Sequence, residues 1–416
     1  MESLNFELAT PRAARGKRAT ALVGVVASGN LEVLLEREGP ADRCTINVST
    51  AAHGFRPLWQ AVIDDFVARR AAGGLRISIN DGGARPDTVS LRLAQGVRLM
   101  EEPAAVADTA DTAYTAYTPR STGWFESGAR QRLQALVDPG TLNESVGPAE
   151  RESSQHLGIF GLPSQFDDGI VIGSASIEGR PVLVAAQEGR FMGGAFGEVH
   201  GAKLTGLLRV AHAMKRDVVI AFDTGGVRLQ EANAGELAIA EIMRALVVAR
   251  EGGVRVIGLI GGRAGCYGGG GLIAGCCSTL IISEQGRISV SGPEVIETNK
   301  GVEEFDSRDR AFVWRTMGGK HRYLIGGADA YADDDAHAFR RAVAAALARP
   351  ACLDQSVLRA EHVRLARRLK RFGDCHDACD IWQAMGLADA QAVPGLTTDT
   401  FLDEANAHRE NADDAR

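Results

Sequence analysis

Two glycine-rich stretches near the middle of the chain contain the residue types that could stabilise negative charge. The first begins with the apolar run Val218–Phe222, passes through Asp223-Thr224 to the pair Gly225 and Gly226, and ends in a segment compatible with a helix. That order is typical of a strand, a tight turn and a helix. Glycine lets backbone N–H groups come close to a ligand because no Cβ stands in the way, and a helix start adds unpaired donors. We therefore expect Gly225 and Gly226 to hold an oxygen that gains negative charge.

The second stretch repeats this arrangement further along the chain. The apolar run 254–260 predicts a buried strand, the glycine-rich segment 261–271 follows, and 272–277 predicts a short helix of small residues. Gly268, Gly269 and Gly270 are expected to line the other wall of the site. A single glycine pair is more often an ordinary turn of an α/β layer, but two such turns in consecutive units favour a site.

Repeated strand, turn and helix units must position these glycines. A third glycine turn, with Gly193 and Gly194, opens a predicted helix that runs to about Met214. Units that repeat every thirty to forty residues predict a superhelical α/β core. Further strands are predicted at 170–177, 180–186, 279–283 and 288–291, and further helices over 130–137, from 292 onward and over 358–372.

The first hundred residues have a different pattern. Two β-runs flank Ser28-Gly29-Asn30 and predict a hairpin, which is followed by a strand at 45–50, a helix over 57–70 and strands at 75–80 and 88–93. We expect a small α+β domain over residues 1–103 and an Ala/Thr/Asp-rich linker over 104–123. A second domain over 124–400 and a polar tail over 401–416 complete the predicted organisation.

Composition excludes several classes of protein. The 416 residues are 45% hydrophobic with a net charge of −7, which argues against nucleic acid as the main partner. The sequence contains no uninterrupted apolar run of about 18 residues, so no membrane span is expected. The N-terminus does not have the pattern of a secretory signal. Seven cysteines form no paired framework. Reduced thiols in the cytoplasm fit this pattern best.

Several motifs carry a resemblance to a known family. The runs 191–203 and 224–231 resemble the carboxyltransferase β-type domains of acyl-CoA carboxylases, which belong to the crotonase superfamily. Within that superfamily the chain is most similar to the β subunit of malonate decarboxylase, in the stretches 231–233, 265–269, 291–297 and 303–310. The resemblance covers about residues 124–400 and implies a crotonase-like (ClpP/crotonase superhelical ββα) domain.

The N-terminal domain resembles a second protein of the same system, the acyl-carrier (delta) subunit of malonate decarboxylase. The stretch 26–33 carries this match. It implies that Ser28 is the covalent attachment point of a phosphoribosyl-dephospho-CoA arm. Without the resemblance, Ser28 would more often be a turn serine that binds local backbone.

Together the two resemblances imply a lyase component that decarboxylates a malonyl thioester on the carrier, giving an acetyl thioester and CO2 through an enolate. Gly225, Gly226, Gly268 and Gly269 would stabilise the oxyanion without a metal. Residues implied to line the arm or substrate are Gly193, Gly194, His200, Cys266, Tyr267 and Gly270. Three of these lining residues, His200, Cys266 and Tyr267, are candidate proton donors. Residues of these types are more often packing residues or substrate contacts than acids.

The resemblance also implies partners: a gamma decarboxylase subunit, an alpha acyl-carrier transferase subunit, a prosthetic-group transferase and a malonyl transferase. Lys215 lies in a tetrapeptide similar to a biotin-attachment site, but it ends a helical pattern, so no biotin is expected on this chain. The alternative function is a carboxyltransferase β component of a biotin-dependent decarboxylase or acyl-CoA carboxylase. A catalytically inactive scaffold for a partner subunit is the non-enzymatic alternative.

Overall fold

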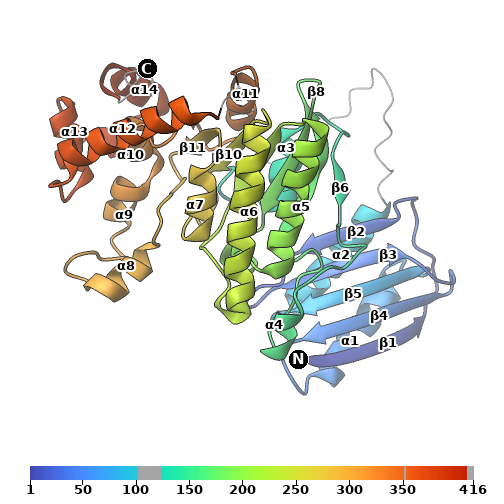
Figure 1. The fold of residues 1–416 in the computed structure, drawn as a ribbon. Coiled ribbons are helices and arrows are strands. Elements are labelled where there is room, and N and C mark those ends of the chain that lie inside the picture. Colours follow the sequence, from blue (N-terminus) through green and yellow to red (C-terminus); the bar gives the residue numbers. More distant parts are fainter. Residues whose placement is uncertain (102–122, 351–352, 410–416) are drawn as a thin grey trace.

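The structure, a computed structural model, describes residues 1–101, 123–350 and 353–409. A small N-terminal part lies beside a larger C-terminal part (Figure 1). The linker expected over 104–123 falls outside the described residues except for Gly123. Within the described ranges, no helix is long and apolar enough to cross a membrane.

The N-terminal part is a five-stranded sheet with two helices on one face. The strand order is β1-β4-β5-β3-β2, in which β4 and β5 are parallel and the other neighbours are antiparallel. Leu31, Val33 and Leu35 alternate along β3 and pack into the core under the helices. The elements are β1 (Glu2–Ala9), β2 (Thr20–Gly24), β3 (Leu31–Arg37), β4 (Arg43–Thr50), α1 (Arg56–Arg69), β5 (Leu75–Asp81) and α2 (Pro86–Glu101).

The predicted hairpin, the strands at 45–50 and 75–80 and the first helix are confirmed, but the strand expected at 88–93 is wrong. Residues 86–101 form α2, whose buried residues include Val89, Leu93 and Val97 at the spacing of one helical face. With Leu91 between Val89 and Leu93, apolar and polar residues alternate as in a strand, which led to the wrong prediction. In the helix the Leu91 side chain is 55% exposed. The edge strand β1 was not predicted.

The C-terminal part is built around a seven-stranded sheet with the order β12-β11-β10-β9-β8-β7-β6. Strands β8 to β12 run parallel, whereas β6 to β8 are antiparallel neighbours. The strands are β6 (Asn143–Ser145), β7 (Ile170–Ile177), β8 (Arg180–Gln187), β9 (Val218–Phe222), β10 (Val256–Ile260), β11 (Thr279–Ser283) and β12 (Ala330–Ala332). Residues 288–291, which we expected to form a strand, make only isolated bridges around Ile288.

Helices cover both faces of this sheet (Figure 1). Alternate residues of β9 enter different cores: Ile220 packs with α5 and α6, whereas Val219 packs with α3 and α11. Because both faces are buried, the strand is apolar throughout. The helices before β12 are α3 (Ala129–Leu136), α4 (Gln155–Ile159), α5 (Glu198–Met214), α6 (Asn233–Glu251), α7 (Gly269–Gly275), α8 (Pro293–Lys300), α9 (Arg310–Met317) and α10 (Gly319–Leu324), with short 3-10 turns η1 (Met192–Gly194) and η2 (Leu229–Glu231).

The end of the chain is packed further than the sequence suggested. After β12 come α11 (Ala336–Leu347), α12 (Gln355–Phe372), α13 (Ala378–Met385), η3 (Val393–Gly395) and α14 (Thr398–His408). Phe401 and Ala405 of α14 are each 1% exposed, and the Phe401 ring lies 4.9 Å from that of Tyr331. A polar tail from 401 is therefore wrong for residues up to 408, because two apolar residues four apart give α14 a buried face.

Candidate active site

The two glycine turns of the sequence prediction lie side by side at the ends of β9 and β10. These parallel strands place Thr224 next to the second turn, where its N–H donates to the carbonyl of Gly265 at 2.8 Å and its carbonyl accepts from Tyr267 at 2.9 Å. A Cβ on Gly268 would lie 3.2 Å from the Cα of Gly226. The turns therefore touch at two glycines, both of which have positive φ.

The third turn joins the same cluster. The N–H of Gly225 donates to the carbonyl of Gly193 at 2.8 Å. Gly194 has φ +65°, and a Cβ there would lie 1.7 Å from the carbonyl oxygen of Asp223, so no other residue fits without moving the backbone. Gly193 and Gly225 are exposed at this corner, whereas Gly194 and Gly226 are buried.

The hydrogen bonds of the glycine N–H groups differ from the expectation. The predicted donor Gly225 is bonded to Gly193, and the predicted donor Gly226 is bonded to Thr224 Oγ1 at 3.1 Å. Gly268 donates to the carbonyl of Val290 at 3.0 Å. The N–H groups of Gly193 and Gly269 have no acceptor among the described residues. In this conformation the N–H groups of the expected pair, Gly225 and Gly226, are bonded within the chain.

The three candidate proton donors are enclosed. His200 is fully buried, with Nε2 3.1 Å from the Gln187 side-chain nitrogen, and burial, with nearby Arg228 and Lys203, holds the pKa of its imidazole well below the usual value. Burial raises the pKa of the Cys266 thiol and, to a lesser degree, that of Tyr267. At neutral pH all three side chains are therefore uncharged.

A buried ion-pair network, which the sequence-based prediction missed, positions the first turn. Arg228 Nη1 lies 2.8 Å from Asp168 Oδ2 and 2.9 Å from Glu231 Oε1. Glu231 in turn accepts the N–H of Glu198, the first residue of α5, at 2.5 Å. Arg228 and Glu231 lie within the stretch that carried the carboxyltransferase resemblance, so their charge and spacing were the signal that could have revealed the network.

Asp223 ties the second turn to the core. Its carboxylate pairs with Arg132 at 2.7 Å and accepts the N–H of Ala264 at 2.6 Å. Both partners of the ion pair are buried. An uncompensated charge at this depth would be costly, so the pair holds the strand end and the turn in one geometry. Asp223 therefore positions the turn through these contacts.

Ser28 lies exposed at the tip of the β2–β3 hairpin. The tip is held from below, because Gly29 donates to the carbonyl of Gly82 at 3.0 Å and Gly82 donates to that of Asn30 at 2.9 Å. Around Gly29, an added Cβ would meet nothing within 4 Å. The Ser28 hydroxyl has no partner among the described residues. A rigid, open tip of this kind fits a serine that receives a covalent group.

The hairpin also contacts the C-terminal part close to the glycine turns. Val25 and Val26 form an apolar cluster with Leu157 and Phe191, and Phe191 directly precedes the third turn. Further along the same interface, β3 is bound through Glu32, which accepts the N–H of Phe166 at 3.0 Å, and through Glu36, which pairs with Arg151. Ser28 is thus in the hairpin that contacts the C-terminal part near the candidate site.

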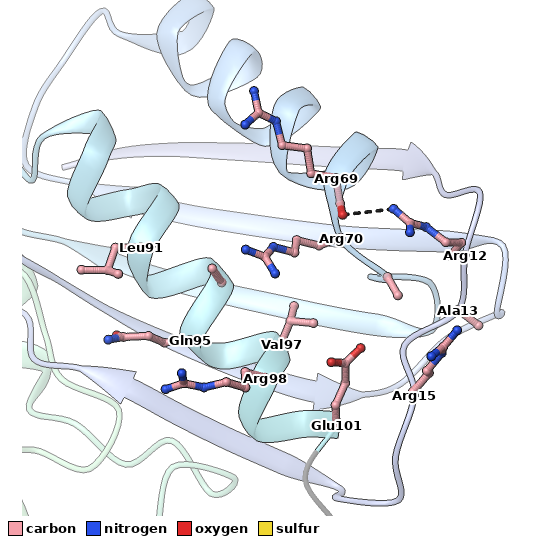
Figure 2. Close-up of a pocket in the computed structure, with 12 residues that line it drawn as sticks. Arg12, Ala13, Arg15, Arg69, Arg70, Leu91, Gln95, Val97, Arg98 and Glu101 are labelled. Carbon is pink, nitrogen blue, oxygen red and sulfur yellow. Dashed lines mark hydrogen bonds between the residues drawn. The ribbon is translucent and has the colours of Figure 1, made fainter. Parts of the chain in front are cut away.

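A separate basic groove lies on the helical side of the N-terminal part. Figure 2 shows arginines from the β1–β2 connection, the end of α1 and the end of α2 around it. Arg12 donates to the carbonyl of Arg69 at 3.0 Å, shown as the dashed line. The groove has a volume of about 830 Å³ and is lined by Arg12, Arg15, Arg69, Arg70, Arg98 and Glu101, among others. It is at the end of the sheet opposite the Ser28 tip.

Comparisons with known proteins agree with this two-part architecture. Residues 18–100 match the malonate decarboxylase delta subunit family, and residues 126–360 match the carboxyl transferase domain family. The malonyl-S-ACP:biotin-protein carboxyltransferase of Malonomonas rubra is 39% identical over 307 residues, which are 68% of this chain and 95% of that protein. The malonate decarboxylase acyl carrier protein of Bradyrhizobium diazoefficiens is 60% identical over 102 residues, which are 24% of this chain and 97% of that protein.

A solved structure of a Pseudomonas malonate decarboxylase hetero-tetramer in complex with malonate also matches. The TM-score is 0.57 at 38% identity, and the match covers 64% of this chain and 98% of that one. The fold and the glycine turns define a carboxyltransferase-type α/β enzyme domain joined to an acyl carrier domain. The chain belongs to the malonate decarboxylase family, and it unites the acyl carrier (delta) and carboxyltransferase-like beta components of that enzyme in one polypeptide. Its acyl carrier domain implies a covalently attached prosthetic group.

Proposed function

We propose that Ser28 carries a phosphoribosyl-dephospho-CoA arm and that the cluster of glycine turns releases CO2 from a malonyl thioester held on it. The observation that carries this proposal is the contact of Val25 and Val26 with Phe191. It places the hairpin that presents Ser28 next to the turn that contains Gly193. The exposed hydroxyl and the open surroundings of Gly29 leave room for the group.

The arm would supply the thioester, whose carbonyl accepts the electron pair of the breaking C–C bond. As CO2 leaves, negative charge develops on the carbonyl oxygen, and donors fixed there stabilise the transition state more than the ground state. The free N–H groups of Gly193 and Gly269 are the donors we propose. Gly225 and Gly226 keep the approach open, because an added Cβ on Gly225 would meet only the Gly193 carbonyl, at 3.6 Å. The proton that completes the reaction would enter from the exposed side, where Gly193 and Gly225 face solvent.

An exposed apolar surface surrounds the turns and supports a requirement for a partner. Leu229 is 89% exposed, Val290 is 63% exposed and Leu272 is 44% exposed, although all three lie within or beside the glycine segments. Such a surface is typical of a protein interface. We propose that the gamma decarboxylase subunit covers it, and that an alpha acyl-carrier transferase, a prosthetic-group transferase and a malonyl transferase act on the carrier.

A second candidate function is transfer of the carboxyl group to biotin on a partner protein. The relative from Malonomonas rubra, whose name states this activity, matches 95% of its own length to this chain. Both reactions need the same stabilised oxygen, so the glycine turns do not distinguish decarboxylation from carboxyl transfer. The two reactions differ in whether the carboxyl group is released as CO2 or transferred to biotin.

Two measurements test the proposal. The intact mass of the purified chain gives the mass of any group on Ser28, with Ser28→Ala as the control. The purified complex is then supplied with labelled malonate, with and without avidin. Release of CO2 that avidin does not inhibit supports direct decarboxylation, and labelled carboxybiotin on a partner supports the transfer reaction. An unmodified Ser28 in an active complex would reject the carrier assignment.

A further inference from the structure

A cavity of about 830 Å³ lies between the two parts of the chain, and its lining includes residues on both sides of Ser28 in the sequence. On one side its walls include Gly24, Val25 and Asn30, which flank Ser28 within the hairpin. On the other side they include Arg190, which directly precedes the Phe191 contact. Cavities of this size hold cofactor-sized ligands. A long group attached to Ser28 is therefore within reach of this cavity.

Arg92 of α2 enters the cavity without a carboxylate partner. Its Nη1 donates to Gln95 at 3.0 Å, and its buried Nε has no partner among the described residues. The guanidinium lies across the hairpin, since a Cβ on Gly24 would be 3.3 Å from Nε. Partial burial and the positive charge of Arg190 lower its pKa. A guanidinium in this position is prepared for an anion that the chain itself does not supply.

Arg190 approaches from the C-terminal part. Its side chain donates to the carbonyl of Glu126, and its backbone N–H donates to Glu188 at 3.3 Å. Two arginines from different parts of the chain repel one another, and an anion bound between them would remove this repulsion. Three carboxylates also line the cavity. The first, Glu144, is paired with Arg130. The second, Glu188, accepts backbone N–H groups, and burial raises its pKa. The third is Glu150.

We propose that this cavity is a binding site for the phosphate groups of the arm, with Arg92 and Arg190 as a two-sided clamp. The inference rests on the proposed attachment at Ser28. The part of such an arm nearest the serine is its phosphodiester, and arginine binds phosphate oxygens through paired N–H donors. Neutralising both arginines at once would strengthen docking of the carrier on the C-terminal part when the arm is present.

The test uses the full chain with Ser28→Ala, which cannot be loaded, and measures the binding of free phosphoribosyl-dephospho-CoA by titration calorimetry. We expect binding of phosphoribosyl-dephospho-CoA and at least tenfold weaker binding of 3′-dephospho-CoA, which lacks the phosphate nearest the serine. Arg92→Gln and Arg190→Gln should each weaken binding of phosphoribosyl-dephospho-CoA about tenfold. Arg98→Gln, on the same helix but in the groove of Figure 2, should leave it unchanged.

Equal affinity of the parent chain and both glutamine variants would overturn the proposal, as would loss of binding in Arg98→Gln alone. Circular dichroism of each variant checks that it folds. Because Arg92 and Arg190 lie in different parts of the chain, the test still holds if one of the two variants fails to fold. The intact mass of the unsubstituted chain separates the two hypotheses. An arm on Ser28 together with unaffected binding in the variants rejects the clamp alone. Binding that depends on both arginines in a chain with no arm supports the phosphate site and rejects the proposed function.

Discussion

The N–H of Gly225 and the carbonyl of Gly193 are joined by a 2.8 Å hydrogen bond that fastens two turns from distant parts of the sequence. Gly193 follows β8, whereas Gly225 follows β9, the neighbouring parallel strand. The bond uses a donor that the sequence had suggested for catalysis. It also fixes the position of Gly193, whose own N–H stays without an acceptor. In the proposed mechanism, structural and catalytic roles are therefore divided between Gly225 and Gly193.

Gly194→Ala should damage this cluster severely. The new Cβ would lie 1.7 Å from the Asp223 carbonyl oxygen at a φ of +65°, so both overpacking and left-handed strain apply. We expect a fall of about 2–5 kcal/mol in the free energy of unfolding, measured by urea denaturation. Gly193→Ala is the matched control. It has a similar φ but nothing within 4 Å of the new Cβ, so its cost should be about 1–2 kcal/mol. Equal costs would show that the contact with Asp223 can relax.

Gly226→Val should slow the chemical step without preventing carrier loading. Gly226 has φ +132° and faces Gly268, so valine would strain the first turn and push a side chain against the second. A side chain against Gly268 would displace the neighbouring N–H of Gly269, a proposed donor. Loss of one oxyanion donor costs about 10²–10³ in rate, and we expect a fall of that order in CO2 release from preloaded malonyl carrier. Gly275→Ala in α7 serves as the control, since its Cβ would meet nothing within 4 Å. Near-normal release by a folded Gly226→Val variant would reject the role of these turns.

The positions of the glycine turns could be predicted because apolar, β-branched runs followed by glycine identify strand ends. The hydrogen bonds of their N–H groups could not, since they depend on three segments meeting in space. The same limit applies to Arg228, whose partner Asp168 lies far away in the sequence. In α2, Val89, Leu91 and Leu93 satisfy the period of a strand and that of a helix over a short window. Only Val97 and Met100, further along, separate the two.

Docking between the two parts was also hidden in the sequence. Glu32 lies on the face of β3 opposite the helical core, where alternation predicts a solvent-exposed residue. The structure instead covers it completely with the C-terminal part. Period-two alternation reports which face a residue is on, and it does not report whether that face meets water or another domain.

Ser28→Ala should abolish malonate turnover and remove any added mass from the chain. The substitution deletes an exposed hydroxyl that has no partner, so stability should change by less than about 0.5 kcal/mol. Ser3→Ala, at an exposed position of β1, should leave both mass increment and turnover intact. The measurements are intact mass spectrometry and CO2 release. A persistent adduct in Ser28→Ala would place the attachment elsewhere.

Glu32 should make docking of the carrier depend on pH. Burial, with the nearby charge of Asp167, raises the pKa of Glu32 well above its ordinary value of 4.5. The docked form therefore binds the proton more tightly than the undocked form. The resulting stabilisation is complete below the ordinary pKa and is lost as pH rises through the raised value.

Glu32→Gln should remove this dependence and strengthen docking at high pH, because the amide oxygen can still accept the N–H of Phe166. Affinity between separately produced fragments 1–103 and 124–416, measured by calorimetry across the pH range, gives the result. Glu38→Gln is the control, since Glu38 is exposed and pairs with Arg76 within the carrier. If the affinity of the parent fragments does not change with pH, Glu32 does not govern docking.

Covalent connection of the two parts should make decarboxylation independent of carrier concentration. In the fusion, docking is intramolecular, and short connections of this kind give effective concentrations of about the millimolar range. The apolar contact of Val25 and Val26 with Phe191 and the bonds of Glu32 and Glu36 supply a specific interface, so the separated carrier should still dock, but with a measurable dissociation constant. For the fragments, the rate of CO2 release from preloaded malonyl carrier should then rise with carrier concentration and saturate. For the fusion, the rate per molecule should stay constant on dilution.

Arg151→Ala would remove the partner of Glu36 and should raise the half-saturating carrier concentration of the fragments several-fold, with little change in the saturated rate. If the fragments and the fusion respond identically to dilution, the connection contributes nothing to docking, and its effect is limited to producing the two components in equal amounts.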